Sequence, residues 1–306
     1  MSKLLLYLIV AALLLAGCGG SDAPTGVEGP LRVVTTTGII GDVAQRIAGP
    51  HAKVEALMGP GVDPHLYKAS ESDVRRISEA DLVLYNGLHL EGKMGDILTK
   101  MARTRPVVAV TEEVPQNLLR EPPEFLGQYD PHVWFDVSMW AQTLGPIVRE
   151  LSALDEEHAA EFQANAAALE KELTELDAWV KAQILTVPEP QRILVTAHDA
   201  FGYFGRRYGM EVVGIQGIST LSEAGLKDVD RVVSLVVDKK VPAIFVEASV
   251  PRRSIEAVQA AVRSRGHEVA IGGQLYSDSL GAANSPAGTY PGMVRANVTT
   301  IVNALK

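Results

Sequence analysis

One long stretch without a helix breaker constrains the fold more than any other feature of the chain. Residues 155–185 contain neither proline nor glycine. Apolar side chains recur there at spacings of three and four residues, which is the spacing of one helical face. They are Phe162, Ala166, Leu169, Leu173, Leu176, Val180 and Ile184. Such a helix would be about 45 Å long, so the pattern predicts a stiff connector packed on two lobes.

On both sides of this stretch, β-branched segments alternate with segments of helical spacing. Residues 31–37 (LRVVTTT) begin the first series, and residues 192–198 (RILVTAH) begin the second. This alternation predicts mostly parallel sheets covered by helices. We therefore predict an α/β fold with an N-terminal lobe over 31–150, a connecting helix over 151–188 and a similar C-terminal lobe over 189–306.

The N-terminus has the pattern of a secretion signal. An unbroken apolar run from Leu4 to Ala16 follows Lys3. It is shorter than the ~20 residues of a membrane span and has the length of a signal-peptide core. The run ends in LLAGC, which resembles a bacterial lipobox and implies cleavage before Cys18 and lipid on its thiol. Cys18 is the only cysteine of the chain, so no disulfide is expected.

These features predict how the protein is processed and anchored. We expect a signal peptide over 1–17 and a flexible, Gly/Pro/Ser-rich tether over 18–30. The mature protein is then held outside the cytoplasm by lipid and does not span the membrane. The formal net charge is -9, and no cluster of lysine and arginine stands out. Nucleic acid is therefore not an expected partner.

Three of the seven histidines share a sequence context. His65 in VDPHLYK and His132 in YDPHVWFD each follow an Asp-Pro pair, and His198 ends the segment RILVTAH. In open α/β sheets, ligands bind beyond the carboxyl ends of the strands. Three imidazoles from both lobes are therefore predicted to converge on a cleft as metal ligands. Each of them taken alone also fits a hydrogen-bonded structural histidine.

Several acidic residues accompany these histidines. Asp63, Asp130 and Asp199 either cap turns or orient an imidazole. Asp278, in GGQLYSDSLG, follows a predicted strand, and pattern alone leaves it between a fourth ligand and a turn former. The other histidines lack this context: His51, His158 and His267 look incidental, and His89 is ambiguous.

A resemblance to a known family rests on six segments. They are VDPHLYK, YDPHVWFD, TAHDAFGYFGRRYG, GIQGISTLSEAGL, IFVEASV and GGQLYSDSLG…GTYPGM. Together they resemble the TroA-like zinc- and manganese-binding lipoproteins, the extracytoplasmic receptors of ABC metal importers. The resemblance extends over residues 31–306.

This resemblance implies an architecture, a ligand and a partner. The family has two α/β lobes joined by one long helix, and it transports Zn²⁺ or Mn²⁺ to an ABC permease. We accordingly expect a monomeric, periplasmic or cell-surface protein without enzymatic activity. Carried over residue by residue, the metal ligands of the family fall on His65, His132, His198 and Asp278.

Two departures leave the metal open. Many zinc-specific relatives carry a histidine-rich loop in the N-terminal lobe, but the corresponding stretch 113–128 has no histidine. Manganese-dedicated relatives usually have a glutamate where this chain keeps His198. The sequence therefore lies between the zinc and manganese patterns.

Other function classes stay open from the residues alone. A zinc hydrolase would use a similar ligand set plus a general base, for which Glu247 is the best candidate, although no H-E-x-x-H motif is present. A surface adhesin is a secondary possibility, since some members of the family carry that label. A receptor for a siderophore, haem or cobalamin would need a wide cleft with arginine or aromatic clamps. It would not need a converging set of three histidines and one aspartate.

Overall fold

The structure, a computed structural model, describes residues 29–125 and 127–306. The predicted signal peptide, Cys18 and nearly all of the predicted tether lie outside the described residues. Among the described residues, no helix has the length and apolar character that a membrane crossing requires.

The N-terminal half contains one parallel sheet of four strands in the order β2-β1-β3-β4. The strands are β1 (Leu31–Thr37), β2 (Ala52–Met58), β3 (Leu82–Tyr85) and β4 (Val107–Ala109). The helices of this half are α2 (Gly38–Ala48), α3 (Glu71–Glu79) and α4 (Gly95–Met101). Strand β1 is buried at every position except Arg32, as its near-continuous β-branched run predicts for a strand covered on both faces.

The C-terminal half contains two parallel strand pairs that lie against each other through β5 and β7. The strands are β5 (Ile193–His198), β6 (Glu211–Gln216), β7 (Ala243–Glu247) and β8 (Ala270–Leu275). The helices are α8 (Gly202–Tyr208), α9 (Leu226–Lys239), α10 (Arg253–Ser264) and α11 (Tyr290–Leu305). The predicted α/β fold with mostly parallel sheets is confirmed.

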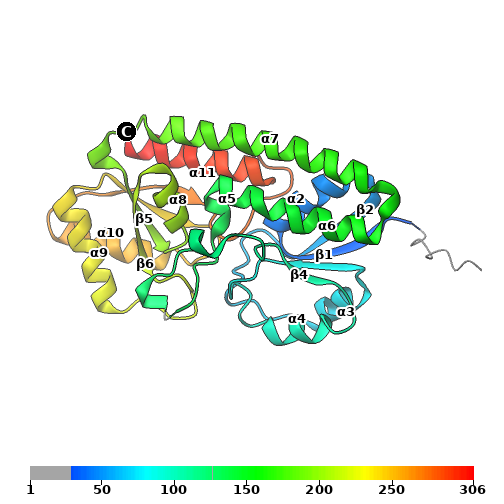
Figure 1. The fold of residues 1–306 in the computed structure, drawn as a ribbon. Helices are drawn as coiled ribbons and strands as arrows, with labels where there is room; N and C mark the ends of the chain where they lie inside the picture. The colour runs from blue at the N-terminus through cyan, green and yellow to red at the C-terminus, as the bar shows by residue number, and fades with distance from the viewer. Residues whose placement is uncertain (1–28, 126) are drawn as a thin grey trace, which may run out of the picture.

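The long helix α7 (Ala159–Ile184) has 26 residues, which corresponds to about 39 Å. All seven apolar residues of its predicted stripe are buried. Figure 1 shows α7 running along one side of the molecule over both halves, with α11 beside it. The helix begins later than predicted, because Asp155 caps a 3-10 turn, η6 (Glu156–His158), that precedes it.

Two helices have no counterpart among the predicted elements. They are α5 (Val137–Trp140) and α6 (Leu144–Leu154), and both pack against α7. Gly145 and Pro146 are both unfavourable inside helices, so the sequence does not indicate that α6 begins at Leu144. Pro146 lies in the first turn, where a backbone N–H has no partner within the helix, so proline is tolerated there.

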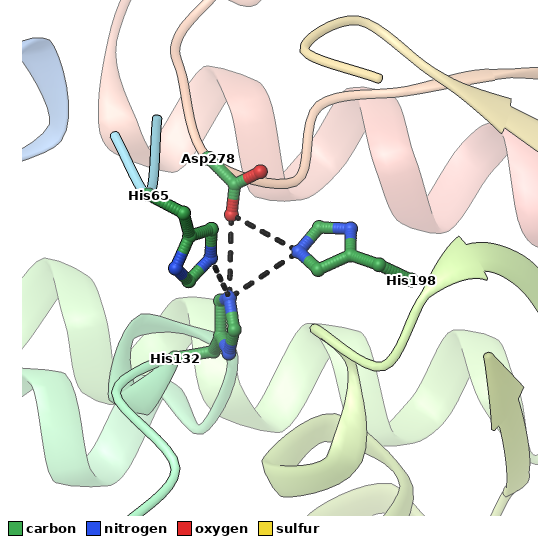
Figure 2. Close-up of side chains that lie close together, drawn as sticks. All are labelled: His65, His132, His198 and Asp278. Atoms are coloured by element: carbon green, nitrogen blue, oxygen red, sulfur yellow. Dashed lines mark hydrogen bonds and ion pairs between the residues drawn. The ribbon is translucent and has the colours of Figure 1, made fainter. Parts of the chain in front are cut away.

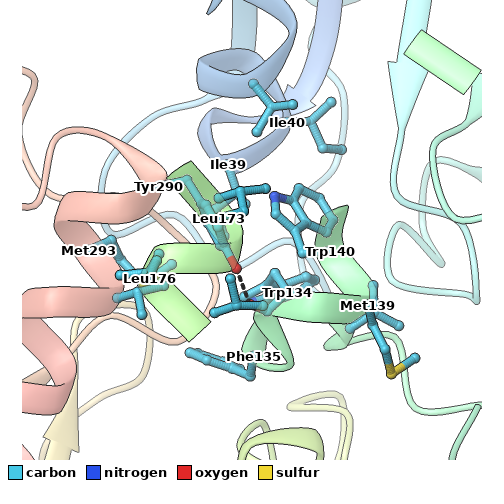
Figure 3. Close-up of a cluster of buried hydrophobic side chains, with 14 of the residues drawn as sticks. Ile39, Ile40, Trp134, Phe135, Met139, Trp140, Leu173, Leu176, Tyr290 and Met293 are labelled. Carbon is cyan, nitrogen blue, oxygen red and sulfur yellow. Dashed lines mark hydrogen bonds between the residues drawn. The ribbon is translucent and has the colours of Figure 1, made fainter. Parts of the chain in front are cut away.

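An aromatic cluster joins the two halves (Figure 3). Trp134, Trp140 and Tyr290 are almost fully buried within one apolar cluster that includes residues of β1, α7 and α11. The Tyr290 hydroxyl donates a hydrogen bond to the Trp134 carbonyl (2.8 Å), and Trp134 Nε1 donates one to the Ser277 carbonyl (2.9 Å). These bonds fix the segment around His132 relative to the segment around Asp278.

Candidate metal centre

The structure brings the four predicted ligands together (Figure 2). His65, His132, His198 and Asp278 each offer one donor atom, and these atoms lie within 4.8 Å of one another. His65 follows β2, His198 ends β5, and Asp278 follows β8. His132 immediately precedes the 3-10 turn η4 (Val133–Phe135). All four residues are between 0% and 2% exposed, so the centre is enclosed by protein.

Four of the six distances between the donors match the edges of a tetrahedron around an ion. His132 Nε2 lies 3.3 Å from His65 Nε2, 3.4 Å from His198 Nε2 and 3.4 Å from an Asp278 oxygen, Oδ1. His198 Nε2 lies 3.5 Å from the same Asp278 oxygen. Corners of a tetrahedron that are each about 2.0–2.1 Å from a central zinc ion are about 3.3–3.4 Å apart. His132, His198 and Asp278 therefore have the mutual spacing of three zinc ligands, with His65 beside His132.

Two carboxylates orient the imidazoles. His132 Nδ1 lies 2.8 Å from Asp130 Oδ1, and His198 Nδ1 lies 2.6 Å from Glu247 Oε2. A neutral imidazole that donates its Nδ1 proton to a carboxylate has its free lone pair on Nε2. The hydrogen-bond partners thus assign to both histidines the tautomer that aims Nε2 at the centre.

Backbone contacts place these residues as well. Asp130 Oδ1 also accepts from the His132 backbone N–H (3.0 Å), while its other oxygen pairs with Arg120. Glu247 Oε1 accepts from the backbone N–H of His198 (2.9 Å). A Cβ on Gly214 would lie 2.5 Å from the Asp199 nitrogen, so glycine is required where β6 meets the end of β5.

Asp63 and Asp199, the aspartates next to His65 and His198 in the sequence, do not orient an imidazole ring. Asp63 Oδ1 accepts from the His65 backbone N–H (2.8 Å), and its Oδ2 accepts from the Thr220 hydroxyl (2.6 Å). Asp63 therefore caps a turn and links it to the C-terminal half. Asp199 lies 3.9 Å from Arg120, and burial raises its pKa to about 6. It contacts none of the four clustered donors through a hydrogen bond within the described residues.

The two oxygens of Asp278 have unequal surroundings. Its Oδ2 accepts hydrogen bonds from the hydroxyls of Ser249 (2.8 Å) and Ser277 (3.0 Å). Its Oδ1 is buried and finds no hydrogen-bond donor among the described residues. Leaving a buried carboxylate oxygen unpaired is costly unless a cation satisfies it. This oxygen faces the Nε2 atoms, which is where a metal ion would lie.

The pKa shifts of the three histidines differ in direction. Burial lowers the pKa of His65 to about 3. Burial acts in the same direction on His132, but Asp130 and Asp278 outweigh it and raise that pKa. Against the same burial effect, Glu247 and Asp278 raise the pKa of His198 well above its ordinary value. Burial would raise the pKa of Asp278, but His198 and His132 hold it well below its usual range. The carboxylates thus stabilise protons or a metal ion at this position.

The structure also brings together two histidines that share no sequence pattern. The rings of His51 and His158 stack with centroids 3.6 Å apart. Asp155 lies beside them, and these three residues form a second group of potential ligands. No local pattern predicts this contact, because the two histidines belong to segments far apart in the chain.

The fold consists of two α/β halves that share one long helix, and three histidines and one aspartate lie between them. This arrangement defines a two-lobed solute-binding protein whose donor set is suited to a metal ion. The chain belongs to the family described as "ZnuA: Zinc-uptake complex component A periplasmic", whose profile matches residues 33–304. The predicted family resemblance is confirmed. This is a family of metal-binding receptors and not of enzymes.

Individual relatives cover nearly the whole chain. The manganese-binding lipoprotein MntA of Bacillus subtilis is 46% identical over 304 residues, 99% of each chain. The zinc-binding protein TroA of Treponema pallidum is 47% identical over 289 residues, 94% of this chain and 92% of TroA. Its solved structure superposes with a TM-score of 0.88 at 46% identity, covering 90% of this chain and 99% of that one. The metal ABC transporter substrate-binding lipoprotein FimA of Streptococcus parasanguinis is 30% identical over 310 residues, 99% of this chain and 98% of FimA.

Proposed function

We propose that this protein captures a divalent transition-metal ion with His65, His132, His198 and Asp278 and delivers it to an ABC permease. The single observation that carries the ligand set is the buried Asp278 Oδ1, which has no hydrogen-bond donor among the described residues and faces two oriented imidazole nitrogens. The names of the relatives, which refer to zinc, manganese and an ABC transporter, support the transport role.

Between the two metals, the geometry favours Zn²⁺. Three nitrogens and one oxygen suit zinc better than manganese in the usual order of divalent affinities. Asp278 Oδ2 already accepts from two serine hydroxyls, which leaves Oδ1 alone for the metal and supports four-fold coordination. Manganese prefers more oxygen ligands, so Mn²⁺ would have to displace a serine to bind both carboxylate oxygens.

The other function classes gain no support. Both oxygens of Glu247 accept hydrogen bonds from His198, so this carboxylate orients a ligand and is not free to act as the base of a hydrolase. The family and the named relatives likewise give no support to a hydrolase or a dedicated adhesin.

The experiment that tests this function is a metal analysis of protein purified without added metal. We expect about one equivalent of zinc in the unmodified protein and much less in Asp278→Asn, which keeps the size of the side chain but removes its charge. An equal metal content in both proteins would show that the metal is bound elsewhere. Uptake of radioactive zinc by cells that express each protein tests the delivery step.

We further propose that Cys18 carries the lipid that anchors a monomeric protein outside the cytoplasm, with lobes over 31–150 and 189–306 joined by residues 151–188. The Cys18→Ser variant should accumulate as unprocessed precursor and lose labelling by a fatty-acid analogue. Normal labelling of that variant would rule out this anchor. Sedimentation of the processed protein tests the monomer.

A further inference from the structure

A second cluster of metal-ligand residues lies at the surface, outside the centre described above. His51 ends the 3-10 turn η1 (Gly49–His51) just before β2, and His158 ends η6 just before α7. Figure 1 shows β2 and the start of α7 at the same end of the molecule. We propose that His51, His158 and Asp155 form an independent, solvent-accessible site for a transition-metal ion of the Zn²⁺, Cu²⁺ or Ni²⁺ class.

The donor atoms are already close together. One atom from each of the three residues lies within 4.8 Å of the others. The two imidazole rings stack at 3.6 Å with an interplanar angle of 21°, so one of the partly exposed rings has to rotate out of the stack before nitrogens of both rings face one ion. Two imidazoles with one carboxylate form a donor set for borderline transition metals, whereas Mg²⁺ and Ca²⁺ prefer oxygen ligands.

Asp155 can cap the 3-10 turn η6 and bind a metal at the same time. Its Oδ1 accepts from the His158 backbone N–H (3.3 Å), and its Oδ2 lies 2.7 Å from His158 Nδ1. Capping therefore uses one oxygen, and the other already faces the imidazole. Glu161 Oε2 lies 2.9 Å from His51 Nε2 and supplies a further carboxylate beside the site.

The segments that carry the ligands are held in place. His51 packs edge-on against the buried Phe162 of α7, with ring centroids 5.9 Å apart. Asn165 of α7 donates from Nδ2 to the Ile47 carbonyl (3.0 Å). These contacts join the end of α2 to α7, so the two histidines do not have to be ordered by the metal. Preorganisation of this kind reduces the entropic cost of binding.

The site remains open to water. The side chains of His51, His158 and Asp155 are 20%, 34% and 21% exposed. A metal ion there keeps water in its remaining positions and can exchange with solvent. We therefore expect weaker binding than at the buried centre, and no dependence on the function proposed for that centre.

Calorimetry of zinc-loaded protein tests the proposal. The protein is first given one equivalent of Zn²⁺ to fill the tighter site and is then titrated with more Zn²⁺. We expect the unmodified protein to bind a second, weaker equivalent, and both His51→Ala and His158→Ala to lose it. His267→Ala is the matched control, because His267 is a partly buried histidine whose Nε2 lies near the Val241 carbonyl, and it should keep both equivalents.

A second measurement needs no variant. Cu²⁺ added in small amounts to the zinc-loaded protein should broaden the ring-proton NMR signals of His51 and His158 before those of His89 and His267. The proposal is overturned if the unmodified protein stops at one equivalent, if both variants retain the second, or if Cu²⁺ broadens other histidines first. In each case the His51–His158 pair would serve only to hold β2 against α7.

Discussion

The two histidine clusters use the same chemical pair in opposite environments. His132 Nδ1 lies 2.8 Å from Asp130 in the buried centre, and His158 Nδ1 lies 2.7 Å from Asp155 at the surface. Both carboxylates raise the pKa of their histidine. The His132–Asp130 pair is shielded from solvent, whereas the His158–Asp155 pair is partly exposed. Hydrogen-bond geometry alone therefore does not distinguish the two clusters.

Burial and convergence make the difference. In the buried centre a third imidazole and the unpaired oxygen of Asp278 share one enclosed space, where charges interact strongly because little water screens them. At the surface, water competes for every donor and screens every charge. We therefore expect the buried centre to bind the metal ion much more tightly than the surface cluster does.

The largest expected effect is that of pH on the buried centre. A metal ion must displace the protons on His132 and His198, whose pKa values are raised, but His65, with its pKa at about 3, is already neutral. Apparent affinity is therefore highest above the raised values and falls as pH drops through them, by up to about 10⁵-fold from pH 7.5 to 5 if both protons compete over the whole range. Chelator competition across this range measures it, with circular dichroism to show that the protein stays folded.

The slope of log affinity against pH shows how many histidine protons the metal ion displaces. Two competing protons give a slope of log affinity against pH of about two, whereas three titrating histidines would give about three. A slope of three would mean that burial does not keep His65 neutral. A flat profile would mean that these histidines are not ligands.

The next largest effect is expected from the removal of one proposed ligand of the buried centre. His132→Ala leaves three donors and should weaken zinc binding by about 100-fold or more, as measured by competition with a chelator. The metal-free protein should melt at nearly the same temperature, because Arg120 still neutralises Asp130. His158→Ala is the matched control, and it should leave the affinity of the buried centre unchanged. Equal losses of zinc affinity in the two variants would contradict the prediction that only the buried cluster forms the tight site.

A smaller effect is expected from the carboxylate that orients His132. Asp130→Asn removes the charge and should weaken zinc binding by about 10-fold, within the range typical of partners that orient a metal ligand. The corresponding change at the surface, Asp155→Asn, should not alter the first equivalent in calorimetry. If Asp130→Asn also has no effect, this carboxylate only caps the turn before His132.

The smallest effect concerns stability. Asp155→Ala removes the side chain that caps the turn before α7 and should lower the free energy of unfolding by about 1 kcal/mol. Urea denaturation of the metal-free protein measures this loss. Glu157→Ala, on the same turn, is the control, and it should change the free energy of unfolding much less. A loss of zinc affinity at the buried centre in Asp155→Ala would contradict the separation of the two clusters.

Much of the fold was predictable because its signals are local. The β-branched runs and the long apolar stripe gave the strands and α7, since side-chain periodicity is a property of neighbouring residues. Helix α6 is not predicted from the sequence, because a proline usually ends or prevents a helix. Pro146 is compatible with α6 only because it lies in the first turn of that helix. The Asp-Pro-His repeats and His198 led to the candidate centre, but pattern alone left Asp278 undecided, and its assignment came from the family resemblance.

By itself the sequence determined the α/β alternation, the long helix and the family, together with the residue types from which a metal site can be built. Only the tertiary structure decided that Asp278 Oδ1 finds no donor within residues 29–125 and 127–306, that Glu247 accepts a hydrogen bond from His198, and that His51 stacks on His158. The physical reason is that hydrogen-bond partners, burial and pKa values depend on groups from distant segments. Their approach is set by the packing of whole helices and sheets, which no short stretch of sequence encodes.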